Sequence, residues 1–303
     1  MLAIVIPYYK IIFFEKTLES LAQQTNKRFR VYIGDDASPD SPEKLLEKYQ
    51  GKFNFTYKKF NDNLGSISLV KQWERCIDMM KDEEWLMILG DDDVLGDNVV
   101  EEFYNNLSMI NEVSNVVRFA TEVIDEKSEV LHSKFIHPKK EWALDSFFRK
   151  ISGKTRSSLS EYVFNSKIFR KKGFVDLPLA WGTDDLAVLD ISEKKPIYTI
   201  NCAIVQVRVS LSSISGKKDN LLLKNKAILQ QGSYILKKHE NQITLEKRKQ
   251  LIDYLEYNIY STGTKDLISG FKLTLLGLYY VDVKCFFNLI KTLFYRNFHE
   301  KYK

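Results

Sequence analysis

Two short runs of the chain, residues 2–6 and 85–89, are apolar without a polar break. A strand with one face in solvent alternates apolar and polar side chains, so an unbroken run indicates a strand buried on both faces. Segments with helical periodicity, such as 67–80 and 99–110, lie between these and other β-rich runs. The alternation predicts an α/β fold in which helices flank a mainly parallel, Rossmann-like sheet.

The composition is that of an ordinary globular protein, with 44% hydrophobic and 28% charged residues, which excludes wholesale disorder. Cys76, Cys202 and Cys285 form no C-x-x-C pair, so neither a disulfide framework nor a cysteine-based zinc site fits. The N-terminal residues lack the pattern of a signal peptide, and no stretch reaches the roughly 18 uncharged apolar residues of a membrane span. We therefore expect a cytoplasmic protein.

The net charge of +5 is unevenly distributed along the chain. Residues 1–216 hold 29 Lys and Arg against 32 Asp and Glu, whereas residues 217–303 hold 16 against 8. We expect one α/β domain over 1–216, followed by a basic, mainly helical segment over 217–303. The apolar, aromatic end of that segment allows two interpretations. Its helices could pack on the first domain or on a second subunit as a homodimer, which is slightly favoured, or lie peripherally on the inner face of a membrane.

Acidic clusters stand where predicted strands end. Asp35 and Asp36 follow residues 31–34, and Asp91, Asp92 and Asp93 follow the apolar run 85–89. Ligands of an open α/β sheet bind beyond the carboxyl ends of its strands. Neighbouring carboxylates raise each other's pKa, and a divalent cation relieves that repulsion. Oxygen ligands suit Mg²⁺ or Mn²⁺, which bind one or two carboxylates together with substrate phosphates. A single pair could instead be a solvated turn, but two clusters on successive strands favour a functional site.

Several other site types are disfavoured. No G-x-G-x-x-G follows a strand, which disfavours a dinucleotide-binding fold, and the H-E-x-x-H motif of zinc proteases and the G-x-S-x-G motif of α/β-hydrolases do not occur. Residues 153–155, G-K-T, match the end of a phosphate-binding loop, but Phe148 stands where that loop requires its first glycine. A nucleic-acid binder needs a basic stripe, and the acidic strand ends oppose one.

Four motifs together resemble those of family 2 glycosyltransferases of the GT-A fold. They are I-V-I-P-Y-Y at 4–9, G-D-D-A-S at 34–38, N-x-N-L-G at 61–65 and I-L-G-D-D-D at 88–93. The resemblance is firm over 1–125 and looser to about 216. It implies transfer of a sugar, with inversion, from a nucleotide-diphosphate donor to a hydroxyl of a glycan or a lipid-linked acceptor. A UDP-sugar is the first expectation for the donor.

The resemblance also implies roles for single residues on the donor side. Pro7 and Tyr8 would line the nucleoside pocket, and Asp36 would bind the base or its ribose. The turn at Asn63 would close that pocket, with Lys71 as a further contact. On the phosphate and ribose side, Asp91 would contact the ribose and Arg208 would reach the donor phosphates.

For the metal and the catalytic base, the resemblance points to two acidic clusters. Asp92 would bind Mn²⁺ or Mg²⁺, supported by Asp93, although the family's Asp-x-Asp-Asp pattern has Gly90 at its first position here. The base would be Asp185, in a pair with Asp184 near the start of a helix. A carboxylate can take the proton of an attacking hydroxyl, and a single displacement inverts the anomeric carbon.

Two alternatives remain open at this point. A metal-dependent nucleotidyltransferase would normally show a glycine-rich loop after its first strand, but residues 7–14 contain no glycine. A catalytically silent module that binds nucleotide or glycan would lack a productive pairing of Asp92 with Asp185.

Overall fold

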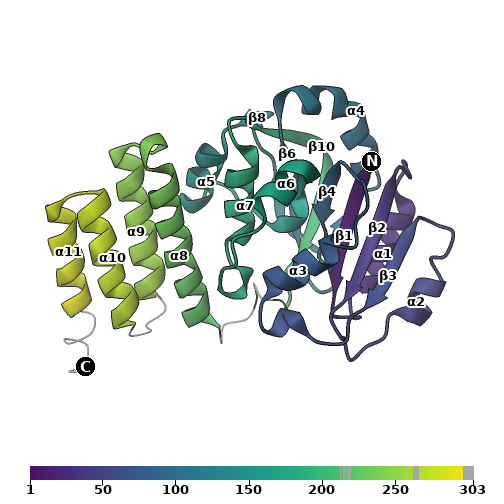
Figure 1. Ribbon diagram of the computed structural model, residues 1–303, viewed down its shortest axis with the longest axis horizontal. Helices are drawn as coiled ribbons and strands as arrows, with labels where there is room; N and C mark the ends of the chain where they lie inside the picture. The colour runs from purple at the N-terminus through teal and green to yellow at the C-terminus, as the bar shows by residue number, and fades with distance from the viewer. Residues whose placement is uncertain (212, 214–215, 217–219, 262–265, 296–303) are drawn as a thin grey trace. The chain divides into compact units, whose positions relative to one another are not determined.

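A computed structural model describes residues 1–211, 213, 216, 220–261 and 266–295 of the chain (Figure 1). The chain divides into two compact units. The first comprises Met1–Asp176 and Ala187–Lys217, and the second comprises Leu177–Leu186 and Lys218–Lys303. Parts of the predicted C-terminal segment, at 217–219, 262–265 and 296–303, lie outside the described residues.

The first unit is built on one sheet with the strand order β3-β2-β1-β4-β9-β6-β10-β5; β7 pairs with β6 and β8 with β10. Strands β3, β2, β1 and β4 are mutually parallel, as are β6 and β10, whereas β9 and β5 run antiparallel to their neighbours. The strands are β1 (Leu2–Tyr8), β2 (Phe29–Asp35), β3 (Phe55–Lys59), β4 (Trp85–Ile88), β5 (Val94–Leu95), β6 (Val116–Ile124), β7 (Val130–Phe135), β8 (Lys140–Glu141), β9 (Tyr162–Asn165) and β10 (Ile197–Arg208).

Helices surround this sheet and bury both faces of its central strands. Every residue of β1 from Leu2 to Ile6 is fully buried, and Trp85 to Ile88 in β4 are nearly so. The prediction of an α/β fold with a mainly parallel sheet is therefore confirmed. The helices of this unit are α1 (Phe14–Gln23), α2 (Glu43–Glu47), α3 (Leu69–Ile77), α4 (Val99–Val113), α5 (Ala143–Ile151) and α6 (Ser166–Lys172), with short 3₁₀ turns η1 (Leu64–Ser66) and η2 (Leu159–Glu161). Helix α7 (Thr183–Ser192) belongs to this unit from Ala187 on, whereas its first residues and the 3₁₀ turn η3 (Pro178–Ala180) belong to the second unit.

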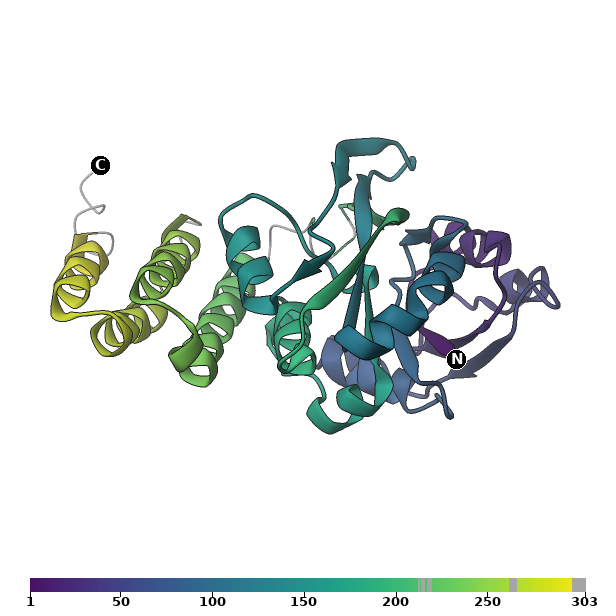
Figure 2. The same ribbon diagram turned by 90° about the horizontal axis from the view of Figure 1, so that it is seen from above.

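The second unit is mainly helical. Its helices are α8 (Leu221–His239), α9 (Leu245–Ser261), α10 (Leu267–Tyr280) and α11 (Val283–Phe294), with the 3₁₀ turn η4 (Glu240–Gln242) between α8 and α9. The four long helices lie side by side in chain order (Figures 1 and 2). Judged by length and hydropathy, none of the helices within the described residues qualifies as a membrane span.

The short segment 177–186 packs with α8, whereas the sequence placed it in the α/β domain. The Lys224 ammonium lies 4.6 Å from the centre of the Trp181 ring. The Gln231 amide donates a hydrogen bond of 3.0 Å to the carbonyl of Gly182. These contacts come from side chains more than forty residues later, so no local pattern in the sequence reveals them.

Candidate active site

Asp91 joins the loop after β1 to the end of β4. One carboxylate oxygen of Asp91 accepts hydrogen bonds from the backbone N–H groups of Tyr9 and Lys10, each at 2.8 Å. Burial raises the pKa of Asp91, and the two N–H donors oppose that rise. The side chain predicted to contact a ribose therefore holds two loops together.

Asp93 is buried and is held from two sides. One carboxylate oxygen accepts a hydrogen bond from the hydroxyl of Ser160, and the other accepts the backbone N–H of Arg208 at 2.9 Å. Ser160 also accepts the backbone N–H of Gly90 at 3.0 Å. Asp93 thus fixes the loop after β4 against η2 and β10, and its predicted support of a metal ligand stays a prediction. Ser160 itself is a site residue that the sequence did not indicate.

Asp92 differs from its two neighbours because no group among the described residues donates a hydrogen bond to its carboxylate. Burial, followed by the charges of Asp93 and Asp91, raises the pKa of Asp92 to about 8, although Lys10 and Arg208 partly offset this. A carboxylate that is crowded by like charges and lacks donors is suited to a cation.

Gly90 explains why the acidic run lacks the usual first aspartate. A Cβ atom at this position would lie 2.9 Å from a carboxylate oxygen of Asp93 and 3.0 Å from one of Asp92. These distances are shorter than ordinary van der Waals contact, so a side chain at position 90 would have to displace the carboxylates that follow it.

Arg208 stands at the end of β10 with its side chain buried, at 2% exposure. Its guanidinium donates to the carbonyl of Asp92 at 3.0 Å, to the carbonyl of Asp125, and to the hydroxyl of Ser128 at 3.1 Å. It also lies 4.5 Å from the centre of the Phe13 ring. The predicted phosphate contact stays a prediction, while these bonds give Arg208 a role in positioning the backbone of Asp92.

Asp36 connects the end of β2 to the N-x-N-L-G turn. Its carboxylate accepts the backbone N–H groups of Leu64 at 2.8 Å and Gly65 at 2.9 Å, and it forms an ion pair with Arg75. Burial raises the pKa of Asp36, and these partners oppose the rise. A Cβ at Gly65 would clash with this carboxylate, which is a physical reason for glycine there.

Arg75, on α3, is a second residue that the sequence analysis missed. Its guanidinium also bonds Asp62 at 2.9 Å and lies 4.0 Å from the centre of the Phe60 ring. Arg75 therefore braces the turn that Asp36 closes. The spacing of 39 residues between Asp36 and Arg75 gives no local signal of the pair.

The remaining residues that were predicted to bind the donor nucleotide differ in burial. Tyr8 is fully buried: its hydroxyl donates to the carbonyl of Asp40 at 2.8 Å, and burial raises its pKa to about 12. Its neighbour Tyr9 is the exposed aromatic residue of this loop. Three further residues are less buried: Pro7 lies in β1 beside β2, Asn63 caps η1 by accepting the N–H of Ser66 at 2.9 Å, and Lys71 is exposed on α3.

Asp184 and Asp185 open helix α7, within segment 177–186 of the second unit. Both side chains are buried, and the Gln231 amide donates a hydrogen bond of 2.8 Å to the carboxylate of Asp185. The chain just before the helix is strained, since Leu179 and Ala180 have φ values of 58° and 51°. Non-glycine residues in such conformations cluster at functional sites. Gln231 is the third residue that the sequence did not indicate.

The described residues of this arrangement do not form a metal site in advance of substrate. Among the described residues, no group of three or more His, Cys, Asp or Glu side chains is placed to hold a metal ion. Within the described part of the cluster, Asp92 is the carboxylate that no protein hydrogen-bond donor engages, which fits a cation that completes its coordination with substrate oxygens and water.

A mainly parallel sheet with an Asp cluster after its fourth strand is the architecture of a GT-A glycosyltransferase. The family model described as glycosyl transferase family 2 matches residues 3–177, more than half of the chain, and the chain belongs to this family. It is therefore a glycosyltransferase, and the nucleotidyltransferase and silent-module interpretations are set aside.

The solved structures that resemble the chain support the same fold. Residues 1–349 of S. aureus TarS in complex with UDP-GlcNAc give a TM-score of 0.56 at 15% identity, covering 96% of this chain and 90% of that one. The complex of the same fragment with UDP gives 0.55 at 14% identity with the same coverage. At this level of identity the likeness concerns the fold. No curated protein matches the chain by sequence.

Proposed function

We propose that the protein transfers a sugar from a UDP-sugar to a hydroxyl of a glycan or a lipid-linked acceptor, with inversion of the anomeric carbon. Membership of glycosyl transferase family 2 supports the donor class. The choice of uridine rests on S. aureus TarS, whose structures contain UDP and UDP-GlcNAc. The acceptor class and the inverting course rest on the family resemblance alone.

The observation that carries this proposal is that the protein hydrogen-bonds the carboxylates of Asp91, Asp92 and Asp93 to different extents. Protein hydrogen bonds engage both carboxylate oxygens of Asp93 and one of Asp91, and the described residues donate none to Asp92, which is the proposed ligand of Mn²⁺ or Mg²⁺ with the donor diphosphate. When bound there, the cation stabilises the negative charge that grows on the diphosphate leaving group. Arg208 keeps the Asp92 backbone in place through its hydrogen bond to the Asp92 carbonyl.

Asp185 is the proposed general base, which takes the proton of the acceptor hydroxyl as the hydroxyl attacks. The hydrogen bond from Gln231 fixes one carboxylate oxygen of Asp185. Because Gln231 also bonds the carbonyl of Gly182, it fixes the loop and the base together. Gln231 is thus a positioning residue.

A screen of nucleotide release tests the proposed donor. With Mn²⁺ present, we expect the protein to release nucleotide from UDP-sugars faster than from GDP-, ADP- or dTDP-sugars. Calorimetry should show the same preference for UDP over the other free diphosphates. Chelation of the divalent cation is the control and should abolish release. Preference for a different base would overturn the uridine assignment while leaving the family assignment intact.

Replacement of Gln231 tests the positioning role. Gln231→Leu removes a donor to Asp185 and should lower kcat about tenfold or more, since misplacement of a reacting group by about 1 Å can cost about a hundredfold. UDP affinity should stay constant, because Gln231 is proposed to act on the base and not on the donor. If UDP affinity or thermal stability fell together with kcat, Gln231 would have only a structural role.

A further inference from the structure

Helix α10 buries mostly small side chains and exposes most of its large apolar ones. It buries Ser269, Gly270, Thr274 and Gly277 along with Leu273. A Cβ at Gly277 would lie 2.6 Å from Leu289 of α11, so the glycine permits close packing of the two helices. The large apolar side chains instead face outward; the exposed ones are Leu267, Ile268, Phe271, Leu275, Leu278 and Tyr279.

Helix α11 carries a second exposed apolar stripe. It buries Leu289 and Leu293 against α10, and it exposes Val283, Phe287 and Phe294. At about 100° per residue, these three exposed positions share one face of the helix. Lys284 and Lys291, seven residues apart, are exposed along one border of this stripe.

The two stripes lie on the same side of the α10–α11 hairpin. The helices are antiparallel, with Gly270 opposite Leu293 and Gly277 opposite Leu289. In each helix the stripe is displaced from these contact residues by about a third of a turn in the same rotational sense. Equal displacement in two antiparallel helices places both stripes on one side. Together they form an apolar face, defined here as the exposed apolar residues of α10 and α11.

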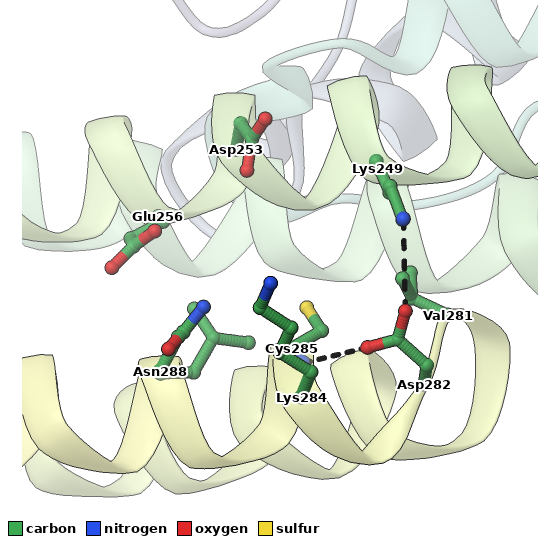
Figure 3. A pocket seen from close by; sticks show the side chains of 9 residues that line it. Lys249, Asp253, Glu256, Val281, Asp282, Lys284, Cys285 and Asn288 are labelled. Carbon is green, nitrogen blue, oxygen red and sulfur yellow. Dashed lines mark hydrogen bonds and ion pairs between the residues drawn. The ribbon is translucent and has the colours of Figure 1, made fainter.

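The opposite side of the hairpin is polar. A groove of about 270 Å³ lies between α9 and α11, and Figure 3 shows the side chains that line it. Asp253 and Glu256 of α9 line this groove, as does Asp282, which pairs with Lys249 at 3.6 Å. The acidic groups of this part of the unit therefore stand away from the apolar side chains. Lys284 lines the same groove as these acidic groups, so Lys272 and Lys291 are the basic residues assigned to the apolar face.

The charges beside the apolar face have a single sign. Residues 267–281 and 283–295 contain Lys272, Lys284 and Lys291 and no Asp or Glu. The flanking aspartates Asp266 and Asp282 cap the two helices by accepting the N–H groups of Ser269 and Cys285. A large exposed apolar surface marks an interaction site, and lysines at its border can extend their ammonium groups to anionic headgroups.

We propose that the apolar face docks on an anionic membrane surface, with α10 and α11 in the interface plane. Apolar and aromatic side chains would enter the boundary of the acyl chains, and Lys272 and Lys291 would contact lipid phosphates. The charge of the lysines beside the apolar face favours an anionic membrane over a second copy of the chain as the partner of that face. Two copies meeting through this face would bring like charges together, and the described residues of α10 and α11 include no acidic partner for them, whereas an anionic bilayer supplies the opposite charge.

Sedimentation of the full-length protein with phosphatidylcholine vesicles, with and without phosphatidylglycerol, tests the proposal. We expect binding to the anionic vesicles only, weakened by salt. Lys272→Gln and Lys291→Gln combined should weaken it about 25-fold, since each lysine near an anionic surface contributes about fivefold. Phe271→Glu with Phe287→Glu should abolish it.

Tyr257→Glu is the matched control, because Tyr257 is an exposed aromatic residue on α9, at 72% exposure, outside the apolar face. This variant should bind vesicles like the unaltered protein. Should the paired glutamates disturb folding, as seen by circular dichroism, the lysine variant still decides the question. The proposal is overturned if the unaltered protein ignores anionic vesicles, or if the lysine variant binds them undiminished. A dimer in solution that Phe271→Glu and Phe287→Glu dissolve, without vesicle binding, would assign the face to a second copy.

Discussion

Asp185→Asn is expected to lower kcat by about 10²–10⁴-fold, the usual contribution of a general base. The amide keeps the size of the carboxylate and can still accept a hydrogen bond from Gln231, but it cannot take the proton of the acceptor hydroxyl. UDP affinity in the presence of Mn²⁺ should therefore change little. Steady-state kinetics with a donor identified by the screen, together with calorimetry of UDP binding, would measure both quantities.

A matched control for Asp185→Asn exists on the same helix. Asp190 has the same exposure as Asp185, 8%, so Asp190→Asn removes an equally buried carboxylate from α7. It should leave kcat within a few-fold of the unaltered enzyme, whatever it does to stability. If Asp185→Asn kept full turnover, or both variants lost it equally, Asp185 would not be the base.

Asp92→Asn is expected to remove the contribution of Mn²⁺ to UDP binding. Loss of a residue that only supports a metal ligand typically costs about 10–100-fold in affinity, so loss of the ligand itself should cost at least as much. Calorimetry of UDP binding with and without Mn²⁺ makes the comparison. Without metal, the variant and the unaltered protein should bind UDP alike, which is the control. An unchanged response to Mn²⁺ in the variant would contradict the assignment.

The raised pKa of Asp92 gives the same assignment a pH dependence. A cation binds the deprotonated carboxylate, so Mn²⁺ affinity should rise with pH up to about 8 and proton release should accompany binding below that value. In the metal-free protein, the folded state holds this proton up to a higher pH than the unfolded chain does. The contribution of Asp92 to the free energy of unfolding should therefore fall as pH rises from about 4 towards 8. Both effects should vanish in Asp92→Asn.

Much of the fold follows from the sequence because the apolar runs of β1 and β4 are uninterrupted, as only strands buried on both faces require. The same reasoning located the acidic clusters, since ligands collect at the carboxyl ends of such strands. The sequence could not show which of the three aspartates are hydrogen-bonded by the protein. Their hydrogen bonding depends on Ser160, 67 residues from Asp93, and on the N–H groups of a loop 81 residues or more before Asp91.

Tyr8 and segment 177–186 show a second limit of the sequence. A tyrosine after a buried strand is compatible with a pocket wall or with a core position, and packing against Phe14 at 4.6 Å between ring centres places Tyr8 in the core. Segment 177–186 is separated from α8 by the remainder of α7 and all of β10. Charge counts along the chain could not show that it packs with α8, because the contacts involve only a few side chains of that helix.

The packing of segment 177–186 with α8 bears on how enzymes of this design can be recombined. A chimera joined after residue 216 would carry Asp185 into the new protein and leave Gln231 behind. The exchanged helices would then decide how firmly Asp185, the proposed base, is held, in addition to whatever they bind. A productive exchange should transplant 177–186 together with α8 as one inherited part, even though β10 separates them along the chain.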